Sequence, residues 1–254
     1  MSGASAVGIV LLFPDLLGTY GDSGNALVLA RRLEWRDYDV ELIEVHGGQS
    51  IPEQADIYVV GGGEDAPQTE AARDIGQDGP LHRAVARGAV VLAVCAGMQI
   101  VGRSFPDSKG AIRRGAGLLD IETVRVDRPR AVGELLVTPD AGLGLPELTG
   151  FENHGGRTRL GKAATALGAV ETGEGNGWGT EGARSGRVIG TYLHGPVLAR
   201  NPALADLLLG WTTGDDLEPL DDTEEAALHR ERVRAARQRE LQPRRSWKDA
   251  IRRG

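Results

Sequence analysis

Short apolar runs alternate with segments of helical apolar spacing in the first half of this 254-residue chain. Residues 6–13 and 89–94 are apolar without alternation, the pattern of strands covered on both faces. Two further strands are predicted at 40–45 and 56–60, and helices are predicted at 23–36, 80–87 and 96–103. This order of strand and helix predicts an α/β fold with a central, mostly parallel sheet flanked by helices.

The second half is poorer in helical patterns. Strands are predicted at 117–126, 133–138, 158–160 and 188–193, and a closing helix at 202–212. We expect one domain over residues 6–212, followed by an acidic linker and an Arg-rich helical tail over 213–254. Residues 223–254 hold ten Lys or Arg and five Asp or Glu, a net charge of +5, against −7 for the whole chain. The tail is predicted to be helical from 224 to 242, followed by Pro243 and a frayed end. It is either a solvated terminal helix or a docking arm for an acidic partner or an anionic membrane surface.

Composition narrows the possible functions. With 41% hydrophobic and 26% charged residues the chain has an ordinary globular composition, and its net negative charge argues against nucleic-acid binding. A single cysteine excludes an intramolecular disulfide and a thiolate zinc cluster. The first residues carry no basic segment, and their apolar run is too short to span a bilayer. A cytoplasmic location is therefore expected.

The single cysteine, Cys95, stands where an apolar strand ends and a helical segment begins, with Ala96 and Gly97 directly after it. A strand–nucleophile–helix turn needs small neighbours because the backbone folds sharply there. The N–H groups and dipole of a helix N-terminus favour a thiolate and can stabilise an oxyanion. A buried structural cysteine is the alternative, but this position favours a nucleophile.

A nucleophilic cysteine also needs a base. His194 ends a predicted apolar strand and precedes Gly195-Pro196, so its imidazole is expected at a strand tip, where the sites of open α/β folds collect. A structural histidine at a turn is the alternative. His154 is a second candidate, which could bind substrate rather than catalyse. Gly61-Gly62-Gly63 could offer backbone N–H groups at another strand tip, or simply form a turn.

Five motifs, in order FPDLLGTYGDSGNALVL, GGGEDAPQ, VCAGMQ, GFENHGGRT and TYLHGP, resemble those of class I (triad-type) glutamine amidotransferases of the cobyric acid synthase-like branch. Within that branch the chain most resembles the glutaminase subunits of lipid II isoglutaminyl synthases. The resemblance covers about residues 6–212 and leaves out the Arg-rich tail. It implies a single-domain amidotransferase-like (flavodoxin-like) fold.

The resemblance also implies a reaction. Cys95 would form a thioester with glutamine and release ammonia, with His194 acting as base and then as acid. The backbone N–H groups of Gly62 and Ala96 would form the oxyanion hole. No metal and no cofactor is implied for this chain.

Substrate binding is implied for four side chains: Gln99, Arg130, Asn153 and His154. Arg130 is expected to clamp the α-carboxylate of glutamine, because a planar guanidinium suits a carboxylate. Arg128 is the alternative for this role.

The chain departs from the family pattern at two positions. Ala93 stands where many relatives have Gly, which is a minor change. Triad amidotransferases carry a Glu two residues after the histidine, and here that position is Pro196. The enzyme therefore uses a Cys–His dyad, a carboxylate of a partner subunit, or another acid of its own. Asp22 is the candidate within the chain, although it could equally be the N-cap of the following helix.

No segment resembles a phosphate-binding P-loop or a Mur-ligase core, so the acceptor of ammonia must be activated elsewhere. The resemblance implies a heterodimer with a Mur-ligase-like synthetase subunit (MurT). That partner would bind ATP and Mg²⁺ and amidate the D-glutamate of lipid II at the inner face of the membrane, in peptidoglycan synthesis. The alternatives are an amidotransferase for a cobyrinic-acid-type corrinoid, a non-catalytic binding module, and a peptidase or redox protein with a similar elbow cysteine.

Overall fold

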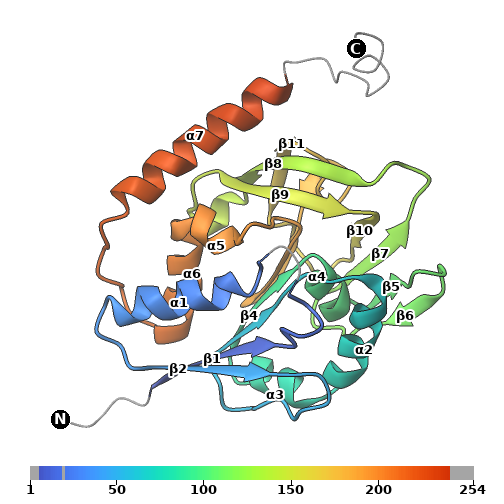
Figure 1. Ribbon diagram of the computed structural model, residues 1–254, viewed down its shortest axis with the longest axis horizontal. Helices are drawn as coiled ribbons and strands as arrows, with labels where there is room; N and C mark the ends of the chain where they lie inside the picture. The colour runs from blue at the N-terminus through green and yellow to red at the C-terminus, as the bar shows by residue number, and fades with distance from the viewer. Residues whose placement is uncertain (1–5, 19–20, 241–254) are drawn as a thin grey trace, which may run out of the picture.

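The computed structural model describes residues 6–18 and 21–240. At its centre lies a six-stranded sheet with the order β13-β14-β4-β3-β1-β2 (Figure 1). These strands are β1 (Val7–Leu12), β2 (Val40–Val45), β3 (Ile57–Val60), β4 (Val90–Val94), β13 (Ala183–Ser185) and β14 (Val188–Thr191). All neighbours pair in parallel except β13, which is antiparallel to β14. The predicted α/β fold with a mostly parallel central sheet is confirmed.

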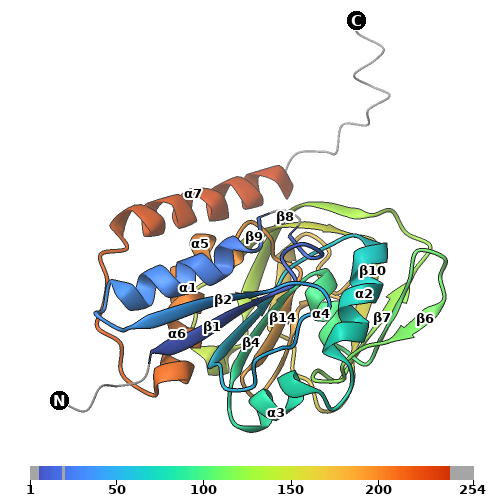
Figure 2. The ribbon, with the colours of Figure 1, turned by 60° about the horizontal axis from the view of Figure 1, so that its bottom comes forward.

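Helices cover both faces of this sheet (Figure 2). On one side lie α1 (Gly24–Glu34), α5 (Val197–Arg200) and α6 (Pro202–Thr213); on the other lie α2 (Asp65–Ile75), α3 (Pro80–Ala86) and α4 (Ala96–Val101). Every residue of β3 and β4 is buried between these layers, which explains why their sequences are apolar without alternation. The edge strand β2 is largely exposed or half-buried.

Two smaller sheets complete the second half of the domain. One has the order β10-β7-β5-β6 and the other β12-β11-β8-β9. Their strands are β5 (Ser104–Pro106), β6 (Ile112–Arg114), β7 (Ile121–Arg125), β8 (Ala131–Pro139), β9 (Leu148–His154), β10 (Gly156–Leu160), β11 (Gly168–Thr172) and β12 (Thr180–Glu181), with a 3₁₀ turn at Ala141–Leu143. Phe151 and His194 form an antiparallel bridge, so β9 runs beside the end of β14.

Several of these elements differ from the sequence prediction. The strand expected from 117 begins at Ile121, and the helix expected to reach 103 ends at Val101. The helix α2 was not predicted, because only Gln68, Ala71 and Ile75 of its described side chains are buried and no apolar stripe marks it. The short strands β5, β6, β11, β12 and β13 and the longer β9 were missed as well. The short strands have two to five residues, too few for a clear period-2 pattern, and in β9 apolar and polar residues do not alternate.

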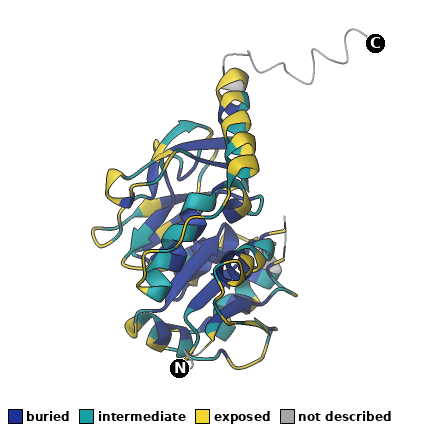
Figure 3. Cartoon of the chain, turned by 90° about the vertical axis from the view of Figure 1, so that its left-hand side faces the viewer, coloured by how far each residue is buried: buried dark blue, intermediate teal, exposed yellow. Residues whose placement is uncertain are grey.

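The Arg-rich segment forms the helix α7 (Thr223–Glu240), which contacts β8, β9, β11 and α5 (Figure 1). Much of the surface of this last helix is exposed (Figure 3). Val233 and Ala236 pack against Leu136 of β8, and Arg237 pairs with Glu147 and Glu171. One face of this part of the tail is therefore occupied within the chain. The last two residues of the predicted tail helix and the frayed end predicted after it, 241–254, lie outside the described residues. None of the described helices combines the length and apolar character needed to cross a bilayer.

Candidate active site at the carboxyl ends of the central strands

Four neighbouring strands of the central sheet deliver one residue each to a common edge. The segment after β1 carries Asp22, the segment after β3 carries Gly62, the turn after β4 carries Cys95, and the segment after β14 carries His194. The carboxyl ends of parallel strands meet at one edge of the sheet, which is where open α/β folds place their sites. Residues separated by up to 172 positions in sequence are brought together in this way.

Cys95 occupies a strained turn between β4 and α4. Its backbone has φ 51° and ψ −105°, a left-handed φ that side-chain-bearing residues rarely adopt. A Cβ at Gly97 would lie 2.5 Å from the carbonyl oxygen of Val60, so only glycine fits two residues after the cysteine. The predicted sharp strand–helix turn with small neighbours is therefore present, and it sets Cys95 at the wall of a cavity.

His194 lies against the carboxylate of Asp22, with His194 Nδ1 and Asp22 Oδ2 2.8 Å apart. Both side chains are buried. Burial would lower the pKa of His194, but hydrogen bonds with Asp22 and with Cys95 outweigh it and raise the pKa to about 10. A charged imidazole is thereby held beside Cys95.

Pro196 stands where the family pattern has a glutamate, and its ring faces the start of α1. A Cβ at Gly24 would lie 2.6 Å from Cγ of Pro196. The carboxylate beside His194 comes instead from Asp22, just ahead of α1. The side chain of Asp22 is directed at the imidazole, and the backbone carbonyl of Asp22 accepts hydrogen bonds from Asn25.

Gly62 is in close contact with both Asp22 and His194. A Cβ there would lie 2.9 Å from both Asp22 Oδ2 and His194 Cε1, so glycine is required for the histidine to approach the carboxylate. The Gly62 N–H donates to Asp22 Oδ2 at 3.0 Å. In this arrangement it is engaged by Asp22, whereas Ala96, the other predicted oxyanion residue, lines the cavity.

The cavity beside Cys95 has a volume of about 280 Å³. All four residues predicted to bind substrate line it: Gln99, Arg130, Asn153 and His154. Its wall also includes Gln68, Arg125 and Arg128. The structure thus gathers the predicted catalytic cysteine and the predicted binding residues around one space.

Gln99 is held at both ends of its amide. Its Oε1 accepts a hydrogen bond from Gln68 Nε2 at 2.7 Å, and its Nε2 donates to the hydroxyl of Tyr192 at 3.2 Å. Sequence reasoning missed Gln68 and Tyr192, although both stand inside motifs that carried the resemblance. Gln68 is the last residue of GGGEDAPQ, and Tyr192 precedes Leu193 in TYLHGP.

Arg130 is fixed along β9. Its Nε bonds the side-chain oxygen of Asn153, and its Nη2 donates to the Asn153 carbonyl at 2.9 Å. Arg128 instead reaches the Gly177 carbonyl, at a long 3.5 Å. Both guanidinium groups are exposed at the cavity, and Arg130 is the more firmly held.

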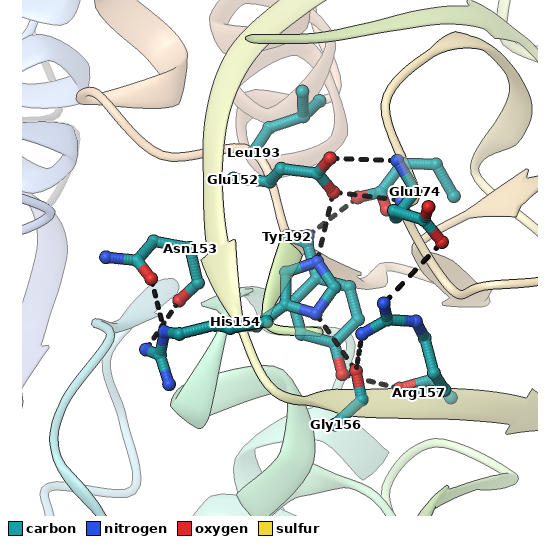
Figure 4. Close-up of polar contacts among 12 residues, drawn as sticks. Glu152, Asn153, His154, Gly156, Arg157, Glu174, Tyr192 and Leu193 are labelled. Atoms are coloured by element: carbon teal, nitrogen blue, oxygen red, sulfur yellow. Dashed lines mark hydrogen bonds and ion pairs between the residues drawn. The ribbon is translucent and has the colours of Figure 1, made fainter. Parts of the chain in front are cut away.

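His154 belongs to a second imidazole–carboxylate pair (Figure 4). Its Nε2 lies 3.1 Å from Glu152 Oε2, its Nδ1 lies 3.0 Å from the Gly156 carbonyl, and its ring stacks on Tyr192 at 3.7 Å. Both ring nitrogens are thus engaged by the protein itself. His154 shapes the cavity wall, and neither nitrogen is directed at Cys95.

Glu152 anchors that wall to the loop after β11. Its carboxylate accepts N–H groups of Glu174 and Gly175 at 2.8 and 3.0 Å (Figure 4). The neighbouring Arg157, also buried, lies 3.5 Å from the Glu174 carboxylate. Over residues 6–18 and 21–240, no group of three or more His, Cys, Asp or Glu side chains is arranged to hold a metal ion.

Comparisons with known proteins agree with this geometry. The model of the CobB/CobQ-like glutamine amidotransferase domain matches residues 8–202. The lipid II isoglutaminyl synthase (glutamine-hydrolyzing) subunit GatD of Staphylococcus aureus (strain N315) is 33% identical over 235 residues, which cover 89% of this chain and 94% of that protein. A cobyric acid synthase of Rhodobacter capsulatus is 36% identical over 184 residues, covering 66% of this chain and 37% of that protein.

Among solved structures, the glutaminase domain of Trypanosoma brucei CTPS with bound acivicin shares the fold. The TM-score is 0.51 at 11% identity, with 84% of this chain and 96% of that chain covered. Together, the match over residues 8–202 and the GatD relative establish the assignment. The chain belongs to the CobB/CobQ-like family of glutamine amidotransferases.

Proposed function

We propose that this chain is the glutaminase subunit of a lipid II isoglutaminyl synthase. The observation that carries the proposal is the buried Asp22–His194 pair beside Cys95, at the wall of a cavity of about 280 Å³. The substrate assignment is supported by the similarity to the GatD subunit of Staphylococcus aureus over nearly the full length of both proteins.

Cys95 is the nucleophile of the proposed reaction. Its thiolate attacks the side-chain amide carbon of L-glutamine, and protonated His194 gives its proton to the departing nitrogen, which leaves as ammonia. The carbonyl carbon stays on sulfur as a thioester. Neutral His194 then takes a proton from water, whose oxygen attacks the thioester, and glutamate leaves as the thiolate re-forms. Asp22 keeps the imidazole oriented and stabilises its charged form.

The cavity wall supplies binding and oxyanion stabilisation. Arg130 pairs with the α-carboxylate of glutamine, since Asn153 already holds its guanidinium in place. The N–H of Ala96, at the start of α4, donates to the oxyanion. For Gly62 to contribute the second donor, its N–H must turn from Asp22 toward the cavity.

The ammonia passes to a partner. We propose a heterodimer with a Mur-ligase-like synthetase subunit (MurT), which carries ATP and Mg²⁺ and activates the D-glutamate α-carboxyl of lipid II for amidation to D-isoglutamine. The amidation takes place in the cytoplasm, at the inner face of the membrane. The support from this chain is that its sequence contains a glutaminase site and no segment like a P-loop or a Mur-ligase core.

A corrinoid acceptor of the cobyrinic-acid type is the second candidate. The similarity to a cobyric acid synthase of Rhodobacter capsulatus favours it, although this chain spans only 37% of that protein. The two candidates share the glutaminase chemistry and differ in the molecule that receives the ammonia.

Transfer of labelled nitrogen distinguishes them. The full chain and the Mur-ligase-like synthetase are incubated with ATP, Mg²⁺, amide-¹⁵N glutamine and lipid II, and the products are analysed by mass spectrometry. We expect ¹⁵N in the α-carboxamide of the stem peptide. With the Cys95→Ala chain, labelling from glutamine should stop while free ammonium still supports amidation by the partner. Labelling of a corrinoid acid but not of lipid II would overturn the acceptor, and absence of glutamate release would overturn the glutaminase itself.

A further inference from the structure

Glu181 is a completely buried acid outside the site described above. It ends β12 of an accessory sheet and reaches across to β14 of the central sheet. Its Oε1 accepts two hydrogen bonds, from the Thr191 hydroxyl at 2.7 Å and from the Tyr192 N–H at 2.6 Å. Burial of an unpaired carboxylate costs free energy, so these two hydrogen bonds stabilise Glu181 in this position.

Thr191 connects this carboxylate to both proposed catalytic residues. Its carbonyl accepts the N–H of Cys95 at 2.8 Å, and its hydroxyl oxygen accepts the N–H of Leu193 at 3.0 Å. The pairing of β14 with β4 ends at Thr191, opposite Val94. Between that point and the backbone bridge of His194 to Phe151, side chains hold the N–H groups of Tyr192 and Leu193.

Tyr192 extends the same connection into the cavity wall. Its backbone N–H is bound by Glu181, its hydroxyl bonds Thr158 at 2.8 Å and accepts from Gln99, and its ring stacks on His154. A shift of this peptide would therefore move a binding residue as well as the segment carrying the base.

We propose that Glu181 and Thr191 form a positioning pair that sets the distance and angle between Cys95 and His194. Glu181 fixes the Thr191 hydroxyl and the Tyr192 peptide, and Thr191 fixes the peptides of Cys95 and Leu193. The pair acts through these backbones and touches no substrate. The inference rests on the roles proposed for Cys95 and His194, because a misplacement of about 1 Å at reacting groups can cost on the order of 100-fold in rate.

The groups around Glu181 allow a conservative test. The pKa of Glu181 is raised to about 7, and burial is the largest cause. The Thr191 hydroxyl and the N–H groups of Tyr192 and Gly182 act to lower this pKa, and nearby Glu152 acts to raise it. Whether or not the carboxyl is protonated, Oε1 serves as an acceptor. The amide oxygen of a Glu181→Gln chain offers the same acceptor at the same place.

The test compares hydroxyl removal with hydroxyl retention. Thr191→Val deletes the hydroxyl and Thr191→Ser keeps it; Glu181→Leu deletes the acceptor and Glu181→Gln keeps it. Thr149→Val is the matched control, because this buried threonine on β9 has a hydroxyl without a hydrogen-bond partner among the described residues. Each full-length variant is assayed for glutamine hydrolysis with the synthetase present, and for the pH dependence of Cys95 alkylation by iodoacetamide.

We expect Thr191→Val and Glu181→Leu to lower kcat by about 10- to 100-fold, with a smaller rise in KM because Tyr192 also contacts the binding residues. Their alkylation profiles should shift to higher pH, because the charged imidazole no longer faces the thiolate. Thr191→Ser and Glu181→Gln should remain within about threefold of the unchanged chain, and Thr149→Val should match it. Lower thermal stability with unchanged kcat and alkylation profile would overturn the proposal, as would Ser and Gln variants as impaired as Val and Leu. The alkylation profile needs no turnover, so it tests the positioning even if the proposed glutaminase activity fails.

Discussion

Two imidazole–carboxylate pairs lie at one end of this molecule, on neighbouring chain segments. His194, after β14, pairs with Asp22 at 2.8 Å, and His154, at the end of β9, pairs with Glu152 at 3.1 Å. All four side chains are buried, and the Phe151–His194 bridge joins the two segments. The pairs differ in what surrounds the rest of each ring.

The His154 ring is fully engaged, with the Gly156 carbonyl on its other nitrogen and Tyr192 against its face. His194 is instead in contact with Cys95, which together with Asp22 raises the pKa of His194 to about 10. A carboxylate partner alone therefore does not identify a catalytic histidine. In the proposed mechanism, the contact of His194 with Cys95 is what distinguishes the base.

Exchange of each histidine for alanine tests this difference most severely. His194→Ala should lower kcat for glutamine hydrolysis by roughly 10⁴-fold or more, because nucleophile and base act as a unit. His154→Ala should cost less than about 100-fold and act partly through KM, since it loosens Tyr192 and Gln99. Glutamate release in steady state is the measurement. Near-normal turnover by His194→Ala, with loss in His154→Ala, would reverse the assignment.

Replacement of each carboxylate by an amide should change the pH dependence of kcat/KM for the Asp22–His194 pair and not for the Glu152–His154 pair. Asp22 helps raise the pKa of His194, so Asp22→Asn should lower it and bring the alkaline limb of kcat/KM down from about pH 10 by one unit or more. For the same reason, the stabilisation from charged His194 is present below the unfolded pKa of 6.5 and is lost as pH rises through about 10. Glu152→Gln should leave the alkaline limb in place. Equal shifts in both variants would contradict the comparison.

The two arginines beside the second pair offer a smaller test. Arg130→Ala should raise the KM for glutamine about 10- to 100-fold with a modest effect on kcat, because a hydrogen bond to a charged group contributes on the order of 1.5–3 kcal/mol. Arg128→Ala should change KM less than about threefold, since Arg128 leans toward Gly177. A raised KM only in Arg128→Ala would transfer the clamp to that residue.

The smallest effect expected is on stability, at Glu181. Its pKa is raised from 4.5 to about 7 in the folded chain, so the stability it contributes is complete below 4.5 and is lost as pH rises through 7. Glu181→Gln removes this titration. Its free energy of unfolding, relative to the unchanged chain, should increase by about 2 kcal/mol between pH 5 and pH 8 in denaturant melts. A pH-independent difference would show that Glu181 does not titrate in this range.

The residues that follow central strands could be predicted from the sequence, and the residues that support them could not. Cys95 and His194 could be located because each follows a largely apolar strand, the signature of a strand buried on both faces of a parallel sheet. Asp22 could be named only as a candidate, because its contact with His194 joins segments 172 positions apart. The supporting residues lie on elements with weak periodicity or inside motifs, and each acts through contacts between segments that are distant in sequence. They are Gln68, Glu152, Glu181 and Tyr192.

The most direct test of the account is covalent labelling by a thiol-alkylating analogue of glutamine. The full chain is incubated with the analogue, and its intact mass and peptide map are recorded with and without excess glutamine. The account predicts one adduct, on Cys95, that glutamine suppresses, that forms more slowly in His194→Ala and that is absent in Cys95→Ser together with glutamate release. An adduct at another residue, or continued glutamate release by the Cys95→Ser chain, would contradict it.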